Sequence, residues 1–425
     1  MKNIRISHVT RALLTVFLGL SLVSMAPAQT ITQLFAFPCV GTSVQTCLDG
    51  ARPYALIQAS DGNLYGAATV SQVVGQVAQG GAIFKLTSSG QFTLLFAFSP
   101  GTKKNYPQGD FPSSLVEGVD GFLYGVAGGG GAHGHGNIFK ISKTGTGFQI
   151  LHSFCALTNC ADGAGGGKLV LGRDRNLYGS SAFGGSTACT NGCGTIFRMT
   201  STGQFTTIHM FNGTDGNSPS GLTPASDGNF YGWANLLQFR ITPAGKFTSF
   251  NSLVFANPRT VMQSDFAQGA DGKLYGVACH YELHQHVLFE VGLDGSNLQT
   301  FSSFEPCQLG FRATLLSASD GNLWEGTRNT SSSTPGSIAA LSPQNGLMVR
   351  SFSIDGANGS EVYGPMIQAK DGTLYGTTYG GGTVSKGTPE GVVFSLNAGL
   401  PPFPEAWQWP GLRAQVANQE LAIEN

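Results

Sequence analysis

The chain alternates short apolar runs with glycine-containing turns, and this pattern predicts β-strands rather than helices. In the first clear unit, an apolar run at 54–59 is followed by Asp61-Gly62 and by a second run at 64–68. An Asp-Gly pair between two apolar runs is typical of a tight β-hairpin. A glycine-rich stretch, a third run at 82–87 and a fourth at 92–98 complete the unit. We therefore predict four short strands in each unit.

The unit recurs along the chain with the signature Asp-Gly-x-Leu-Tyr-Gly, which is intact in some copies and altered in others. Its seven copies begin at Asp61, Asp120, Asp174, Asp227, Asp271, Asp320 and Asp371. The mean spacing is about 52 residues, within the range of propellers and solenoids. We interpret the repeated Asp as a turn former and the repeated aromatic residues as packing between units.

The two ends of the chain are complementary. Residues 31–37 resemble the fourth strand of the first unit, whereas the last unit stops near Leu400 after its third strand. Pairing of these ends closes a ring and removes exposed strand edges. A linear β-solenoid is the alternative, but its repeats are usually shorter and need caps. The predicted fold class is all-β: a seven-bladed β-propeller of four-stranded blades over 29–400, with the N-terminal strand completing the last blade.

The amino-acid composition limits the kinds of partner to be expected. The chain has 61 Gly, only 11% charged residues and a net charge of −1. The low share of charged residues disfavours long helices. The near-zero net charge gives no reason to expect a nucleic acid or an anionic membrane as partner.

The N-terminus predicts export. Lys2, Arg5 and Arg11 precede a short apolar stretch, and Ala26-Pro27-Ala28 places small residues at a cleavage site. We expect a signal peptide over 1–28, a secreted or periplasmic protein, and no transmembrane segment in the mature chain. The tail at 401–425 is expected to be poorly ordered. We also expect a monomer.

Eight cysteines follow the expected cleavage site, and their even number favours disulfides over a zinc site, because no Cys-x-x-Cys pair occurs. Proximity in sequence suggests the pairs Cys39–Cys47, Cys155–Cys160, Cys189–Cys193 and Cys279–Cys307.

The repeat resembles a known family. Asp-Gly-x-Leu-Tyr-Gly, a glycine-rich loop, Gly-x-Ile-Phe-Lys-Leu-Thr and Gly-x-Phe-Thr-x-Leu-x-x-Phe together look like the bacterial GloVer tandem repeat of "choice-of-anchor" proteins. The resemblance covers about 31–400 and is weakest in the fourth to sixth units. The resemblance implies the repeat architecture and export of the protein, but it implies no enzymatic activity. One copy, 320–327, also resembles repeats of sensor-associated and streptogramin-lyase-like propellers.

Two sets of residues are candidates for binding. If 280–286 is extended, His280, Glu282, His284 and His286 lie on one side and offer nitrogen and oxygen ligands to a divalent metal. His133 and His135 occupy the equivalent loop of the second unit. Solvated loop residues are the alternative interpretation, and no cofactor is predicted.

Four polar residues stand three positions before a turn Asp. They are Gln58, Glu117, Gln268 and Gln368. They are placed to line the channel and bind a polar ligand such as a sugar, or to satisfy buried backbone groups.

Two functions follow. The first is an extracellular binding or structural module that engages a glycan, an envelope component or a partner protein. The alternative is a secreted polysaccharide lyase or hydrolase with a metal or general base in the 280–286 loop. Catalytic residues cannot be named from the sequence.

Overall fold

The computed structural model describes residues 30–41, 44–74, 77–99, 106–235, 237–250, 260–280, 285–301, 314–326 and 336–402. The predicted signal peptide and the tail from residue 403 onward lie outside these residues. Within the described part, no helix is long and apolar enough to cross a membrane.

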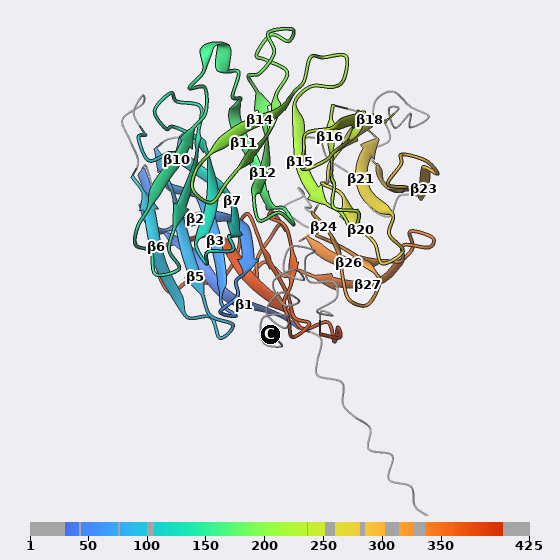
Figure 1. Ribbon diagram of the computed structural model, residues 1–425. Helices are drawn as coiled ribbons and strands as arrows, with labels where there is room; N and C mark the ends of the chain where they lie inside the picture. The colour runs from blue at the N-terminus through green and yellow to red at the C-terminus, as the bar shows by residue number, and fades with distance from the viewer. Residues whose placement is uncertain are drawn as a thin grey trace, which may run out of the picture.

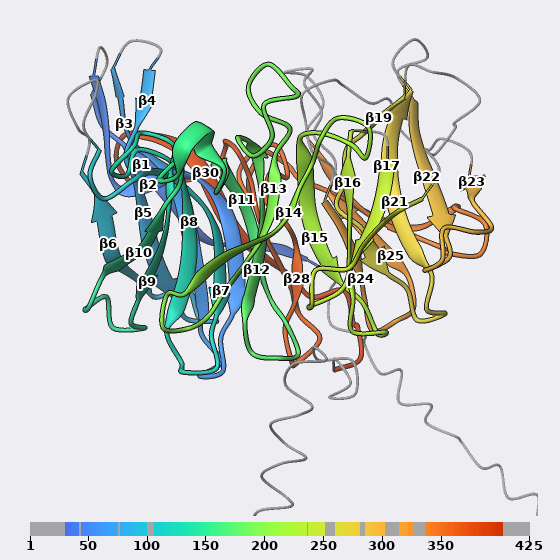
Figure 2. The ribbon, with the colours of Figure 1, turned by 45° about the horizontal axis from the view of Figure 1, so that its top comes forward.

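The strands form seven antiparallel sheets arranged in a ring (Figures 1 and 2), so the predicted seven-bladed propeller is confirmed. Blade 1 contains β2 (Val44–Gln58), β3 (Leu64–Val74), β4 (Val77–Gln79), β5 (Gly81–Leu86) and β6 (Phe92–Phe98); blade 2 contains β7 (Asp110–Glu117), β8 (Leu123–Gly129), β9 (Asn137–Ile141) and β10 (Gln149–Ser153). A 3-10 turn, η1 (Thr158–Cys160), precedes blade 3, which contains β11 (Ala164–Leu171), β12 (Leu177–Phe183), β13 (Thr195–Met199) and β14 (Phe205–Met210). Blade 4 contains β15 (Pro219–Pro224), β16 (Phe230–Ala234), β17 (Leu237–Ile241) and β18 (Phe247–Ser249).

The remaining blades follow the same order. Blade 5 contains β19 (Thr260–Met262), β20 (Ala267–Gln268), β21 (Leu274–His280), β22 (Gln285–Val291) and β23 (Gln299–Phe301); blade 6 contains β24 (Thr314–Ser317), β25 (Leu323–Gly326), β26 (Ser337–Leu341) and β27 (Met348–Ser353). Blade 7 contains β28 (Ile367–Gln368), β29 (Leu374–Thr377), β30 (Thr388–Leu396) and, as its fourth strand, β1 (Ile31–Cys39). In blade 5 the first strand is divided, and both β19 and β20 pair with β21.

The ring is closed as the complementary ends predicted. β1 pairs antiparallel with β30, from Ile31 opposite Leu396 to Cys39 opposite Thr388. β2 and β3 of blade 1 are longer than predicted, because their pairing continues beyond the blade to Val44 opposite Val74. Figure 2 shows this hairpin rising from one face of the ring.

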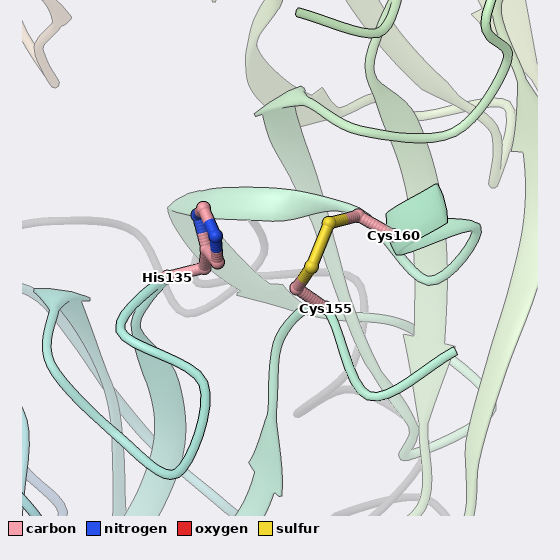
Figure 3. Close-up of side chains that lie close together, drawn as sticks. All are labelled: His135, Cys155 and Cys160. Atoms are coloured by element: carbon pink, nitrogen blue, oxygen red, sulfur yellow. A yellow bond between two sulfur atoms is a disulfide. The ribbon is translucent and has the colours of Figure 1, made fainter. Parts of the chain in front are cut away.

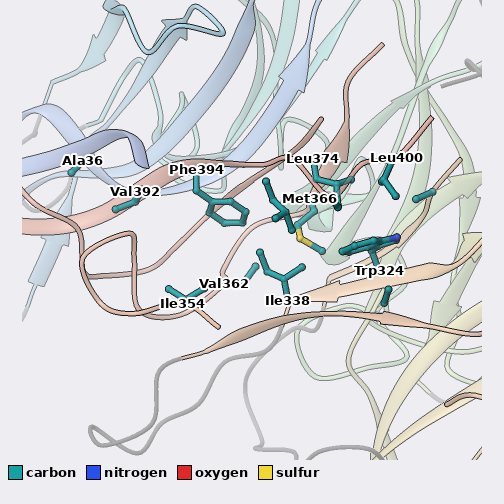
Figure 4. Close-up of a cluster of buried hydrophobic side chains, with 14 residues drawn as sticks. Ala36, Trp324, Ile338, Ile354, Val362, Met366, Leu374, Val392, Phe394 and Leu400 are labelled. Carbon is teal, nitrogen blue, oxygen red and sulfur yellow. The ribbon is translucent and has the colours of Figure 1, made fainter. Parts of the chain in front are cut away.

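The core lies between adjacent blades, as the alternating apolar positions require. Figure 4 shows one such layer between blades 6 and 7, where Trp324 and Ile338 face Met366, Leu374 and Phe394. Because each blade buries its two faces against its neighbours, the repeat positions that carry these side chains are structural.

The antiparallel order gives the ring two different faces. The turns between the first and second strands and between the third and fourth lie on one face, which we call the short-turn face. The connections between the second and third strands and between blades lie on the other, the long-connection face. The first strands of the blades surround the central channel.

Candidate functional site

The four predicted polar residues lie at the short-turn face and join neighbouring blades. In each case the side-chain oxygen accepts a hydrogen bond from a backbone N–H of the preceding blade, an arrangement that we call the inter-blade clasp. The clasps run from Ser60 to Glu117 Oε2 (2.7 Å), from Ser226 to Gln268 Oε1 (2.8 Å), from Ser319 to Gln368 Oε1 (2.8 Å) and from Lys370 to Gln58 Oε1 (3.0 Å). The last clasp joins blade 7 to blade 1.

These contacts favour the interpretation that the four residues satisfy backbone groups, while ligand binding by them stays a prediction. Blades 3 and 4 have Leu171 and Pro224 at the same position. Neither side chain can accept a hydrogen bond. A shallow hollow lies between these two blades and is lined by Leu171, Pro224 and Phe230 among others.

The repeated Asp residues stabilise their own turns. Asp61 Oδ1 accepts the N–H of Asn63, and its Oδ2 accepts the hydroxyl of Tyr65 at 2.8 Å. The same bond to the aromatic residue four positions later recurs in blades 2 to 5, and in blade 6 Trp324 donates its Nε1–H to Asp320. Burial raises the pKa of these tyrosines, so they stay protonated donors at neutral pH. The turn-former interpretation explains these contacts.

The fifth-blade histidine segment is a hairpin rather than one extended strand. β21 ends at His280, β22 begins at Gln285, and Cys279 pairs with His286. The condition under which the four predicted ligands share one side is therefore not met. Glu282 and His284 lie outside the described residues, as does the side chain of His280.

His286 lies in a buried polar cluster at the interface of blades 5 and 6. Its Nε2 is 2.7 Å from Gln263 Oε1 and its Nδ1 is 3.6 Å from Glu325 Oε1. Glu325 is 0% exposed and His286 is 8% exposed. Burial lowers the pKa of His286 to about 4, so the imidazole is neutral at neutral pH. The two ring nitrogens thus face different groups, Nε2 the side-chain amide of Gln263 and Nδ1 the carboxylate of Glu325.

The position of Glu325 explains how a carboxylate reaches this interface. In the other six blades this position is glycine, and the residue opposite on the third strand is phenylalanine, as in Gly66 opposite Phe84. A Cβ on any of the six glycines would overlap that phenylalanine ring. In blade 6 the pair is Glu325 opposite Ala339, so the carboxylate side chain takes the position of the missing ring. The signal for this residue is present in the sequence, since Glu325 stands where the other six repeats have glycine, but it follows no metal-ligand spacing.

The second-blade histidines lie in an exposed loop on the long-connection face. His135 lies beside Cys155 and Cys160 (Figure 3), and their ligand atoms are within 4.8 Å of one another. Among the described residues, these three form the one group of His, Cys, Asp or Glu side chains close enough together to hold a metal ion. The two cysteines form a disulfide, so in this state their sulfur atoms are not thiolate ligands. His133 is exposed and is not part of the group.

Three of the four suggested disulfides are present: Cys39–Cys47, Cys155–Cys160 and Cys189–Cys193. Cys279 is also disulfide-bonded, and its suggested partner Cys307 lies outside the described residues. Disulfides of this number are consistent with an oxidising compartment.

Taken with the fold, these features define a propeller repeat protein whose constant residues hold the blades together. The Gloeobacter/Verrucomicrobia repeat model matches residues 52–238, which confirms the GloVer resemblance over the first three blades and most of the fourth. No curated protein matches the sequence.

Solved propeller structures share the fold at low sequence identity. A streptogramin B lyase is 14% identical with a TM-score of 0.55, covering 87% of this chain and 97% of its own. A catalytically inactive virginiamycin B lyase from Staphylococcus aureus, with quinupristin, has the same identity and TM-score and covers 86% of this chain and 99% of its own. An oligogalacturonate lyase in complex with manganese is 12% identical with a TM-score of 0.52, and the match covers 89% of this chain and 98% of the lyase. Likeness at this level shows the fold alone.

Proposed function

We propose that the protein is an extracellular binding module whose long-connection face holds a glycan, an envelope component or a partner protein. The observation that supports this proposal is the unequal distribution of exposed large apolar side chains over the two faces of the ring. Within the described residues, the long-connection ends of strands and loops carry Val40, Leu48, Phe111, Leu157, Phe183, Met210 and Val261, whereas the short turns and the strand ends beside them carry Leu347 and Met348. The other two exposed large apolar residues, Leu94 and Val349, lie within outermost strands. Seven of the eleven exposed large apolar side chains among the described residues therefore lie at the long-connection face, and loops held by a rigid scaffold are the usual place for a binding site.

The polar groups of the short-turn face support the same assignment. Its Asp side chains bond to their own turns, and its clasps bond to the neighbouring blade. A face whose polar groups already bond to the protein offers fewer of them to a ligand, because each exchange breaks an existing hydrogen bond.

The test compares the two faces with matched substitutions. Leu48→Asp and Phe111→Asp place a charge on the long-connection face, and Leu347→Asp places the same charge on a short turn. We expect the first two to weaken binding of the full chain to isolated envelope polysaccharide and protein fractions at least fivefold, and Leu347→Asp to leave it unchanged. Equal loss from all three variants, or no binding by the unsubstituted chain, would contradict the proposal.

A secreted polysaccharide lyase or hydrolase is a second candidate, and the buried His286–Glu325 pair is the observation that favours it. The imidazole is neutral at neutral pH and lies beside a buried carboxylate, and the neutral form is the one that a general base requires. The candidate requires that polysaccharide be cleaved by the full chain and that His286→Gln abolish the cleavage. Binding without cleavage would leave the first function standing.

A further inference from the structure

Tyrosines outside the repeat gather at one place, the seam between blades 7 and 1. Of the eleven tyrosines in the chain, six occupy the repeat position after the turn Asp. Three of the other five, Tyr54, Tyr363 and Tyr379, form an edge-to-face chain, with ring centroids 5.1 Å apart between Tyr54 and Tyr363 and 5.0 Å apart between Tyr363 and Tyr379. We call these three residues, together with Arg52 and Glu390, the seam cluster.

The seam cluster lies at the channel mouth on the long-connection face. Arg52 and Tyr54 are on β2, the first strand of blade 1, and Tyr363 lies just before β28, the first strand of blade 7. Tyr379 follows β29 in a connection of the long-connection face. All three rings are partly exposed, whereas the repeat tyrosines are buried.

A charged pair accompanies the rings. The guanidinium of Arg52 lies 4.7 Å from the ring centroid of Tyr379, and its Nε is 3.5 Å from Glu390 Oε2. Arg52 holds a left-handed backbone conformation with φ of 53°, which is uncommon for a residue with a side chain. The pair places hydrogen-bond donors and acceptors side by side at the edge of an aromatic surface.

This combination matches the chemistry of a sugar ring. A pyranose has a face of C–H groups that packs on aromatic rings, and vicinal hydroxyls that both donate and accept hydrogen bonds. Ligand sites commonly combine aromatic walls with a few polar groups that fix orientation. The charged residues of the cluster and its neighbour Glu361 are one cation and two carboxylates, which disfavours an anionic polymer.

We infer that the seam cluster is the subsite at which this protein binds a neutral, hexose-containing polysaccharide. A pyranose stacks on the partly exposed tyrosine rings, and the Arg52–Glu390 pair bonds its hydroxyls. This inference rests on the proposed function, because it assigns a ligand class and a location on the long-connection face.

The test measures affinity of the full, disulfide-bonded chain for laminarin, hydroxyethylcellulose and galactomannan, with polygalacturonate as the anionic comparison. We expect binding to at least one neutral polymer and a loss of affinity of at least tenfold in Tyr363→Ala. Tyr106→Ala is the matched control, because Tyr106 is a partly exposed tyrosine outside both the repeat and the cluster. It should bind within twofold of the unsubstituted chain.

Two further variants separate binding from ring closure. Tyr363→Phe keeps the ring and should retain affinity within about threefold. Arg52→Asn keeps a residue that tolerates positive φ but removes the guanidinium, and should lose about fivefold with an unchanged melting temperature. Binding that is indifferent to all cluster variants would overturn the subsite and leave the proposed function intact. Absence of binding to every neutral polymer, or preference for polygalacturonate, would overturn the ligand class.

Discussion

The interface between blades 1 and 2 and the interface between blades 5 and 6 use the same strand positions with different side chains. Between blades 1 and 2, the ring of Phe139 covers Gly125, and Glu117 clasps the backbone of Ser60. Between blades 5 and 6, Glu325 and Ala339 replace the Gly–Phe pair. Ser317, which stands in the clasp position, is too short to reach the neighbouring backbone as Gln does.

The difference shows that this fold needs complementary volumes at an interface more than it needs any one residue. A glycine and a phenylalanine fill the same space as a glutamate and an alanine. Exchanging both partners preserves strand pairing and adds a polar cluster of Glu325, His286 and Gln263 to an interface that otherwise stays apolar. Four experiments test that comparison.

The largest loss of stability is expected when the phenylalanine ring between blades 1 and 2 is removed. Phe139→Ala leaves a cavity over Gly125 and is expected to lower the free energy of unfolding by about 3–5 kcal/mol. Urea denaturation measures the change. Ala339→Gly in blade 6 is the comparison and should cost only about 1 kcal/mol, because no ring is lost there. Equal losses would show that the two interfaces are packed alike.

Acidification should act on the polar interface. The pKa of His286 is about 4 in the folded chain and about 6.5 in an unfolded one, so between these pH values the unfolded state binds more protons. Stability therefore falls as pH is lowered from about 6.5 to about 4, and His286 contributes up to about 3 kcal/mol of that loss. His286→Asn should flatten the pH dependence of the melting temperature, whereas substitution of the exposed His135 should not. An unchanged pH profile in His286→Asn would contradict the assignment.

A ring forced into blade 6 should conflict with the carboxylate. Ala339→Phe alone is expected to destabilise by about 1–3 kcal/mol, because Glu325 already fills the space. Glu325→Gly in the same chain should recover at least half of the loss, since it recreates the pair found in the other blades. A double-mutant cycle measures the coupling. Additive effects would mean that Glu325 and the new ring do not share a site.

The smallest expected effect comes from adding a clasp. Ser317→Gln gives blade 6 the side chain that clasps blade 5 to blade 4, and should stabilise by about 0.5–1 kcal/mol. Gln268→Ala should remove a similar amount. Chemical denaturation at neutral pH resolves both changes. Destabilisation by Ser317→Gln would show that the position faces a different environment in blade 6.

The repeat made the architecture predictable from the sequence. The seven turn Asp residues gave the blade count, and the likeness of 31–37 to a fourth strand gave the closure, because both depend on local patterns that recur. Three disulfides were predictable because their cysteines are at most eight residues apart.

The candidate sites were less predictable because they depend on contacts between distant residues. Each clasp crosses from one repeat to the next, as with Ser226 and Gln268, so the repeat pattern shows the residue but not its partner. The seam cluster brings Arg52 to Tyr379 only through ring closure. The surroundings of His286 depend on the reversal of the chain between β21 and β22. The apolar–polar pattern alone did not predict that reversal.

The pairing of β1 with β30 has a consequence for how the chain acquires its structure. Gln33 bonds to Thr383, 350 residues later in the sequence, so β1 finds its partner only after the six blades between them have been synthesised. Contacts this distant in sequence slow folding, and an unpaired strand edge is open to association with other chains in the meantime. Until the seventh blade is completed, β1 and β30 therefore each present an edge that can mispair.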